Sequence, residues 1–236
     1  MASDRMNRAD RKQAIIEAAR PLFAQNGFNG TSVRSIAKAA GVSEGLLYKH
    51  FPSKDDLYKE ILGYVVDLSG IFSSEISKLN PGAESLVKYA YLTIRLILFE
   101  VPAFKEAQYW HERLLFRSLV GDSRYARAHF KNIQDYFVPE IQKSIEAAIE
   151  DGDMEGSDIE PHNKFWFFHH LAMAMNLCYL PDDPLNKKAL VYDGPKEELA
   201  RQMLMFGLRG MGMTNEAITR YHQPDELEAF FNRLYS

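Results

Sequence analysis

Five apolar residues near the start of the chain recur at positions i, i+3, i+4, i+7 and i+8, which is typical of an amphipathic helix with one buried face. This spacing predicts a helix over about residues 8–26, which Gly27 ends. Pro21 lies inside the pattern, where it lacks a backbone donor and is expected to kink the helix. The five residues are Ile15, Ala18, Ala19, Leu22 and Phe23.

Two short helices separated by a tight turn are predicted next. Thr31 or Ser32 is a suitable N-cap for the first helix, and Gly41 favours a sharp turn after it. Ser43 is a second N-cap, and the helix that it begins runs for about two turns before Pro52 ends it. Two helices joined in this way form a helix-turn-helix.

The rest of the chain also has a helical period. Ser53 and Asp56 have the spacing of a capping box, which opens a long helix to about Leu79. No pair of segments has the turn chemistry of a β-hairpin. The sequence therefore predicts an all-α chain: a three-helix domain over residues 1–53, joined by the long helix to a helical bundle over residues 54–236. Further helices are expected at about 83–99, 102–119, 122–150 with a break at Pro139, 161–180, 196–212 and 224–235.

Charge is distributed unevenly along the chain. The net formal charge is −4, yet residues 1–54 hold nine Lys or Arg and only four Asp or Glu, a net charge of +5. The remaining 182 residues therefore carry a net charge of −9. Only the N-terminal part suits a polyanionic partner, although a chance cluster of solvated side chains gives the same balance.

Composition narrows the class of protein further. With 236 residues, 46% hydrophobic and 25% charged, the chain can bury a sizeable core and is neither low-complexity nor wholly disordered. The single cysteine, Cys178, excludes an intrachain disulfide and a cysteine-based zinc site. No signal peptide is recognised, and the longest apolar stretch, residues 165–180, is too short and too interrupted for a membrane helix. We therefore expect a cytoplasmic protein.

Two segments carry a resemblance to a known family. They are TSVRSIA at residues 31–37 and GVSEGLLYKHFPSKDDL at residues 41–57, preceded by Ala-Ala at 18–19, Leu-Phe at 22–23 and Gly-Phe at 27–28. Over about residues 12–65 the chain strongly resembles the TetR family of bacterial transcriptional regulators. The resemblance implies a repressor that binds a palindromic DNA operator as a homodimer and is released by a small, largely apolar effector.

The resemblance also implies which residues contact DNA, and the chemistry of the side chains suggests roles for them. Hydroxyl, imidazole and ammonium groups suit phosphate oxygens, as at Thr31, Ser32, Tyr48, His50 and Lys54. Each of Tyr48, His50 and Lys54 is, taken singly, equally well an ordinary core or surface residue. The resemblance assigns DNA contacts to Arg34, Ser43, Gly45, Tyr48, Lys49, His50 and Lys54. The residues expected to read bases are Arg34, Glu44, Leu46 and Lys49. An arm that enters the minor groove is expected to contain Arg5, Arg8 and Arg11.

A recognition helix of two turns reads only a few base pairs, so useful specificity needs two copies about 34–36 Å apart. The predicted helix over residues 161–180 is apolar nearly all round, which indicates burial on both sides, against its own bundle and against a second copy. The alternative is a core helix of a monomer. The expected interface residues are Phe167, Leu171, Met175, Leu199, Met203, Phe206 and Gly210.

Aromatic residues are frequent in the middle helices, and core packing accounts for most of them. Some are expected to line an apolar effector cavity, beside a few polar groups that orient the ligand. The candidate effector residues are Arg95, Gln108, Trp110, His111, Arg113 and Asn176.

Two other classes of protein compete with a regulator. A helical enzyme would need a catalytic constellation, but the chain has no Glu-x-x-His motif, and the adjacent His169 and His170 point to different helix faces. No cofactor and no metal are therefore expected. A scaffold without affinity for DNA would leave the basic N-terminal part unexplained, and salt-dependent binding to duplex DNA distinguishes this class.

Overall fold

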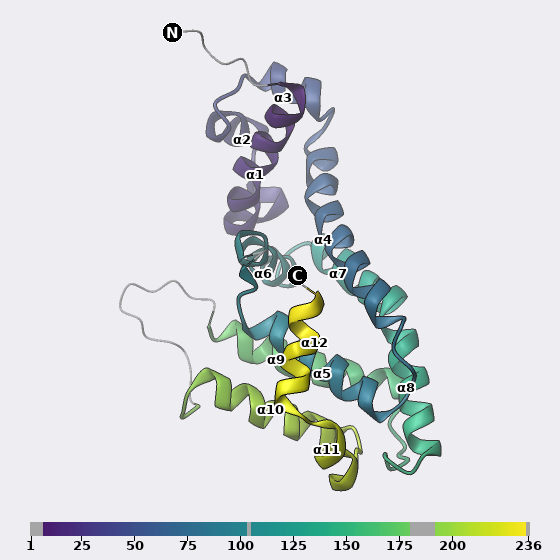
Figure 1. Cartoon of the computed structure of the whole chain (residues 1–236). Coiled ribbons are helices and arrows are strands. Elements are labelled where there is room, and N and C mark those ends of the chain that lie inside the picture. Colours follow the sequence, from purple (N-terminus) through teal and green to yellow (C-terminus); the bar gives the residue numbers. More distant parts are fainter. Residues whose placement is uncertain (1–6, 103–104, 180–191, 235–236) are drawn as a thin grey trace. The chain divides into compact units, whose positions relative to one another are not determined.

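The computed structural model describes residues 7–102, 105–179 and 192–234, without side chains at 64–74 and 107. These described residues form twelve helices and no strand, which confirms the predicted all-α class (Figure 1). The helices are α1 Arg8–Gly30, α2 Val33–Ala39, α3 Glu44–His50, α4 Lys54–Ile76, α5 Ala83–Leu98, α6 Lys105–Leu119, α7 Arg124–Tyr136, α8 Val138–Glu150, α9 Pro161–Leu177, α10 Lys196–Gly210, α11 Asn215–Tyr221 and α12 Pro224–Leu234.

The chain divides into two compact units. Unit 1 holds the residues up to Ser69 together with Glu106–Asn132, and unit 2 holds Gly70–Lys105 and Ile133–Ser236. Unit 1 thus joins the predicted three-helix domain to most of α4, most of α6 and the first part of α7. The predicted boundary between residues 53 and 54 concerns functional domains and stays a prediction.

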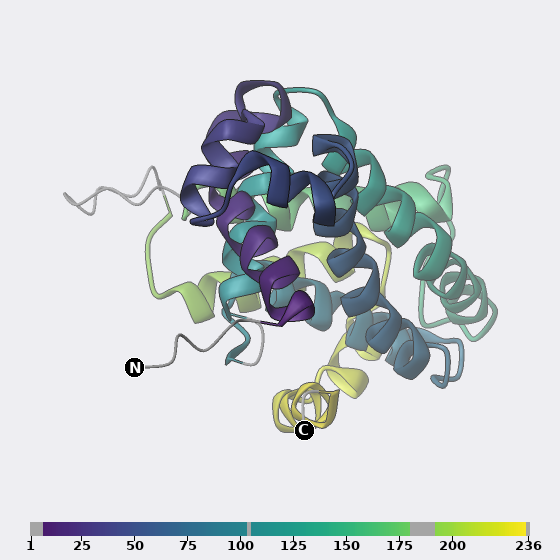
Figure 2. The same cartoon turned by 90° about the horizontal axis from the view of Figure 1, so that it is seen from above.

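The core of unit 1 is formed by the faces that the apolar spacing predicted. Apolar side chains from its first four helices are buried together, and burial of such groups is the main favourable contribution to folding. The short helices α2 and α3 pack side by side, with α2 also against α1; Figure 2 gives the view from above. The buried residues are Ile15, Ala19, Phe23, Ile36, Ala37, Leu47, Phe51, Leu57 and Ile61.

Helix α1 differs from the prediction at Pro21. The helix runs on through Pro21, and the residue inside it with non-helical dihedrals is Gly27, at φ 70°. Glycine adopts this left-handed conformation without the steric cost of a side chain, so the chain turns at Gly27.

Unit 2 is built around α5. This helix packs against α8, α9, α10, α11 and α12, and its buried face includes Leu86, Val87 and Leu98. The break predicted near Pro139 is present, since α7 ends at Tyr136 and α8 begins at Val138. Helix α11 was not predicted, although Thr214 caps it by accepting a hydrogen bond from the Ala217 N–H at 3.2 Å.

Candidate nucleic-acid interface

The helix-turn-helix of unit 1 is closed by local hydrogen bonds. The Ser32 hydroxyl accepts from the Ser35 N–H at 3.0 Å at the start of α2, and the Ser43 hydroxyl accepts from the Leu46 N–H at 3.1 Å at the start of α3. Between the helices Gly41 has φ 64°. The Val42 N–H donates to the Ala37 carbonyl and the Gly41 N–H to the Lys38 carbonyl, which together form a Schellman motif. The sequence therefore fixes the angle between α2 and α3 through caps and one left-handed glycine.

Most of the predicted DNA contacts lie on the surface of this motif. Tyr48 is 46% exposed, although it is a large aromatic residue. Leu47, directly before it, is fully buried, so one face of α3 packs into the core and the opposite face is exposed to solvent. The exposed candidates are Ser32, Arg34, Ser43, Glu44, Gly45, Tyr48 and Lys49, and the half-buried ones are Leu46, His50 and Lys54.

Three exposed cations on α2 and α3 make no ion pair with any acidic side chain in the described part of the chain: Arg34, Lys38 and Lys49. Elsewhere in unit 1, by contrast, Lys12 pairs with Glu60 at 2.7 Å, and Lys59 pairs with Asp55 at 3.0 Å. Lys38 was missing from the predicted contacts, although its spacing from Arg34, one helical turn, places both on one side of α2. The helix-turn-helix thus has a basic surface, which suits a phosphate backbone.

Thr31 lies in the interior of unit 1, whereas a contact with DNA was expected of it. It is only 2% exposed, and its hydroxyl donates to the carbonyls of Leu22 at 3.0 Å and Gly27 at 2.8 Å. The hydroxyl therefore satisfies carbonyls at the end of α1. Its predicted role as a phosphate ligand stays a prediction, and in the described conformation neither the side chain nor its donor faces solvent.

Lys54 also turns inward. Its Nζ donates to the carbonyls of Phe28 at 2.7 Å and Thr31 at 2.9 Å, and it lies 4.3 Å from the centroid of the Phe28 ring. In the described conformation two of the three N–H donors of the ammonium group are thus used by carbonyls at the end of α1. The predicted contact with a phosphate stays a prediction and would use the third donor.

The predicted minor-groove arm is only partly described. Arg5 lies outside the described residues, whereas Arg8 and Arg11 belong to the first turns of α1. Asn7 caps this helix by accepting from the Asp10 N–H at 2.9 Å. Arg8 and Arg11 are therefore held on a helix rather than on an extended arm, which corrects that expectation.

Arg124, at the start of α7, connects the later part of unit 1 to the helix-turn-helix. Its Nη1 lies 2.7 Å from Asp55 Oδ1 on α4, and its guanidinium carbon lies 4.3 Å from the centroid of the Phe28 ring. The pKa of Asp55 is below its usual value, chiefly because of the hydrogen bond from Lys59 and further because of Arg124. Phe28 is thus contacted by two cations, Lys54 and Arg124. The α6–α7 segment is in this way tied to the end of α1 and the start of α4.

The six candidate effector residues are divided between the two units. Gln108, Trp110, His111 and Arg113 are in unit 1, and Arg95 and Asn176 are in unit 2. Arg113 lies over the Tyr109 ring at 3.6 Å, and Tyr109 packs edge-on against Trp110. Their role as effector ligands stays a prediction.

His111 belongs to a buried cluster in unit 1. Its Nδ1 shares a 2.8 Å hydrogen bond with the hydroxyl of Tyr125, a residue that is 1% exposed, and its ring lies 4.7 Å from that of His129. Burial lowers the pKa of His111 to about 4, because an imidazolium ion loses its hydration there. Residues Tyr125 and His129 were not singled out from the sequence, since their closeness to His111 depends on the α6–α7 packing.

The predicted interface residues on α9 and α10 fall into two classes. Phe167 is 62% exposed and Phe206 is 67% exposed, whereas Met175 and Leu199 are buried within unit 2. Side chains already packed in their own unit offer little area to a partner, so the interface role of the last two has less support, and it stays a prediction. Gly210 is exposed, and Leu171 and Met203 are half-buried.

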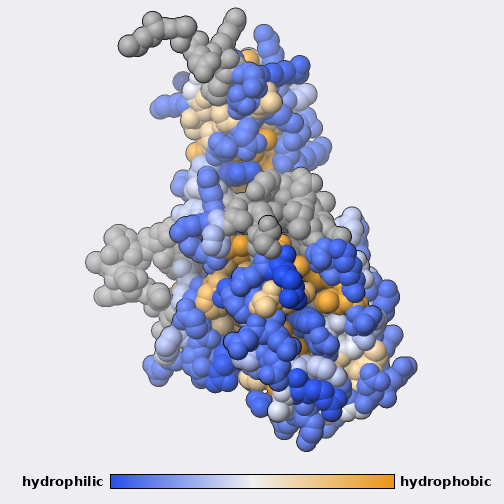
Figure 3. All heavy atoms as spheres, in the orientation of Figure 1, coloured by the Kyte–Doolittle hydropathy of each residue, from blue (hydrophilic) through white to orange (hydrophobic). Residues whose placement is uncertain are grey.

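The exposed residues of α9 form one stripe. Phe167, His170, Ala174 and Leu177 are all exposed and follow the spacing i, i+3, i+7 and i+10. The face of the molecule in Figure 3 is mostly hydrophilic, with hydrophobic residues between the polar ones. Exposed apolar side chains such as Phe167 and Leu177 on one side of a helix are typical of an interface.

Among the described residues, no three His, Cys, Asp or Glu side chains gather as they would around a metal ion. Within the same ranges, no helix has the length and apolar character needed to cross a bilayer.

Comparison with known proteins identifies the family. Residues 15–61 match the model of bacterial regulatory proteins of the tetR family. The transcriptional repressor KstR2 of Rhodococcus jostii (strain RHA1) is 30% identical over 184 residues, which cover 76% of this chain and 85% of that protein. The chain belongs to the TetR family. As its relatives are transcriptional regulators, this TetR-family protein is a regulator and not an enzyme.

Solved structures show the same fold as this TetR-family protein. The ketosteroid transcriptional regulator KstR2 of Mycobacterium tuberculosis has a TM-score of 0.59 and 19% identity, covering 91% of this chain and 100% of that one. AibR in complex with isovaleryl coenzyme A and operator DNA also has a TM-score of 0.59, with 20% identity, covering 83% of this chain and 97% of that one.

Proposed function

We propose that this TetR-family regulator represses transcription by binding a palindromic operator in the bacterial cytoplasm as a homodimer, and that a small-molecule effector releases it. The observation that carries the proposal is the basic surface formed by Arg34, Lys38 and Lys49, which lack acidic partners in the described part of the chain. Such a surface on α2 and α3 suits a polyanion, and α3 has the size to enter a major groove.

Dimerisation is supported by the exposed apolar side chains of unit 2. Phe167 on α9 and Phe206 on α10 are large and mostly exposed, although each belongs to a helix whose other face is buried. Two copies that pack these faces together around a two-fold axis would remove the exposed rings from water. The same symmetry would present two α3 helices to successive major grooves.

Coupling between effector binding and DNA binding is supported by the segments of the chain that make up unit 1. Residues 106–132 come from the part of the chain that follows α5, yet they fold with the helix-turn-helix, where Arg124 contacts Asp55 and Phe28. An effector that favours one arrangement of the α6–α7 segment would thereby change the DNA-binding unit. The proposal needs two states of this segment with different affinities for DNA.

The proposal is tested by selecting preferred duplexes from a random pool and by measuring the mass of the protein in solution. We expect a palindromic site, a dimer, and an affinity that falls steeply between 50 mM and 200 mM salt. Phe206→Glu should yield a monomer with weak operator binding, while Val120→Glu, at a position 82% exposed in unit 1, should remain dimeric. Salt-independent binding, or none, would instead favour a scaffold.

A further inference from the structure

Arg95 is held between two aromatic rings in unit 2. Its guanidinium carbon lies 4.8 Å from the centroid of Phe99, one turn further along the chain, and 4.8 Å from that of Phe231 on α12. A guanidinium group stacks on aromatic faces and keeps its N–H donors at its edge. Both rings therefore lie close to the guanidinium carbon, and the N–H groups of Arg95 are the donors that could bind an oxygen ligand.

The donors of Arg95 are not fully used. Its Nε is buried and has no hydrogen-bond partner in the described part of the chain. The carboxylate nearest to it is that of Glu228, whose Oε1 lies 3.6 Å from Nη2, longer than a strong charge-assisted hydrogen bond. Glu228 also accepts a hydrogen bond from the Tyr91 hydroxyl. A buried donor without a partner costs free energy, and a ligand oxygen would remove that cost.

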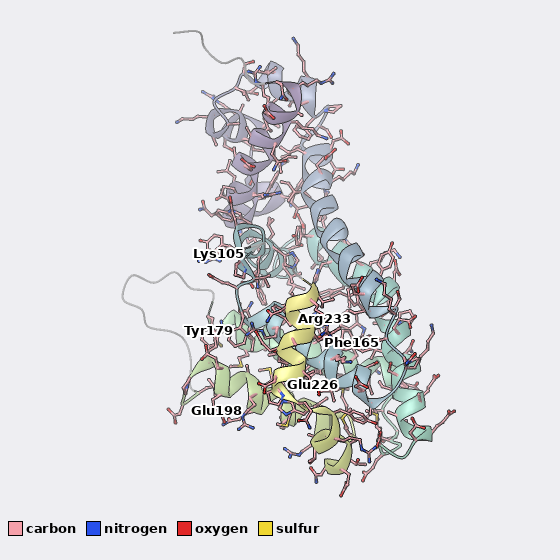
Figure 4. All side chains as sticks on the ribbon, viewed as in Figure 1. Lys105, Phe165, Tyr179, Glu198, Glu226 and Arg233 are labelled. Atoms are coloured by element: carbon pink, nitrogen blue, oxygen red, sulfur yellow. The ribbon has the colours of Figure 1, made fainter. Side chains whose placement is uncertain are left out.

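A second cation lies at the same ring. Lys196, the first residue of α10, has its Nζ 5.4 Å from the centroid of Phe99 and 4.3 Å from that of Tyr179. Tyr179 follows the end of α9 and is labelled in Figure 4. Both cations approach Phe99, so they lie within about 10 Å of one another. Two positive charges among three aromatic rings form a half-buried site in which the attraction for an anion is less screened than at the surface.

Two described acidic residues of unit 2, Glu228 and Glu197, bear on this site. Glu228 is 46% exposed in its side chain and is shared between Arg95 and Tyr91. The pKa of Tyr179 is raised chiefly by burial, and the charges of Cys178 and Glu197 contribute further. Glu197 itself is exposed to solvent. The rings of Phe99, Tyr179 and Phe231 add apolar surface beside the cations.

We propose that Arg95 and Lys196 bind the anionic group of an amphipathic organic anion, a carboxylate or a phosphate ester, whose apolar body packs against these rings. The proposal rests on the proposed function in that this anion is the effector. It changes the sequence-based expectation of a largely apolar ligand, because an apolar molecule would leave the Arg95 donor unpaired. The other explanation is structural, with Arg95 serving to hold α12 to α5 through Glu228.

The test uses the full-length protein and four probes of equal chain length: octanoate, octyl phosphate, 1-octanol and octylamine. Calorimetric titration should show binding of the two anions and none of the alcohol or the amine at the same concentrations. Arg95→Met and Lys196→Met should each weaken anion binding at least about tenfold, in line with the loss of one charge-assisted hydrogen bond. Lys143→Met is the matched control in unit 2, because Lys143 pairs with Glu140 on α8 away from this cluster.

Equal binding of 1-octanol and octanoate would overturn the proposal, as would Arg95→Met and Lys196→Met variants that bind both anions normally. If Arg95→Met fails to fold, Lys196→Met provides the test by itself, since Lys196 begins a different helix, α10, and contacts the rings of Phe99 and Tyr179. Operator binding without any probe is measured separately. If the protein bound no operator, the proposed function would be refuted. The titration with the anions would still test whether Arg95 and Lys196 form a binding site.

Discussion

Phe168 on α9 lies directly over Gly207 on α10. A Cβ atom built at Gly207 would overlap Cδ2 and Cε2 of the Phe168 ring, and both residues are buried. The two helices therefore approach more closely here than any residue with a side chain would allow. Phe167, the neighbour of Phe168, is 62% exposed, so this contact also sets how the proposed dimer face is presented.

Gly207→Ala should destabilise unit 2 by about 1–3 kcal/mol, because overpacking forces the Phe168 ring or the helix to move. Urea unfolding measures this loss, and the dimer should weaken with it. Gly63→Ala on α4 is the control, since nothing lies within 4 Å of a Cβ there, and helix propensity predicts a gain of up to about 1 kcal/mol. An unchanged stability of Gly207→Ala would show that the helices separate freely.

Lys54→Met separates an internal role from a contact with DNA. Because Nζ donates to the carbonyls of Phe28 and Thr31, its loss should lower the stability of the protein by about 1–3 kcal/mol. The control Lys38→Met removes an exposed lysine and should leave stability within about 0.5 kcal/mol. It should instead weaken binding to every duplex and reduce the salt slope by about one.

If Lys54→Met kept full stability and reduced the salt slope, the side chain would leave the carbonyls and contact a phosphate in the complex. The original prediction from the sequence would then hold, and the hydrogen bonds to Phe28 and Thr31 would belong to the free protein only.

Lys49 on α3 is expected to read a base rather than a phosphate. It is exposed and belongs to the same helix as Leu46 and Tyr48. Lys49→Ala should change the preferred base at one position in each half-site, with a discrimination of about 1–3 kcal/mol, because a lysine donates to guanine O6 and N7. Binding to duplexes that vary one base pair at a time checks this. An equal loss for all duplexes would assign Lys49 to the backbone.

The stability of the protein should fall as the pH is lowered from about 6.5 to about 4, with His111 as one cause. Its pKa is lowered to about 4 in the folded chain from an ordinary value of 6.5, so the unfolded chain binds the proton first. The contribution is complete above pH 6.5, and about 3 kcal/mol is lost by pH 4. His111→Gln removes the titrating ring, so its stability should depend less on pH than that of the unchanged protein.

Nuclear magnetic resonance titration gives an independent measurement. The His111 ring should stay neutral to about pH 4, whereas the exposed His170 serves as the comparison, since burial lowers its pKa by a smaller amount. A His111 midpoint near 6.5 would show that water reaches the pair formed with Tyr125.

The sequence by itself determined most of the helices, the caps of the helix-turn-helix and the family, although it missed α11. Those features depend on residues three or four positions apart: Ser43 caps the Leu46 N–H, and Gly41 closes the turn between α2 and α3. Local spacing of this kind can be read along the chain, because each hydrogen bond lies within one helical turn. The exposed α3 candidates followed from the same helical period.

Only the tertiary structure decided which groups the long side chains contact. Lys54 finds carbonyls 23 and 26 residues earlier, and Arg124 pairs with Asp55 across 69 residues. No periodicity encodes such distances, since they depend on how packed helices bring remote segments together. The inclusion of residues 106–132 in unit 1, the burial of Thr31 and the contact of Phe168 with Gly207 arise in the same way, from packing that no local pattern specifies.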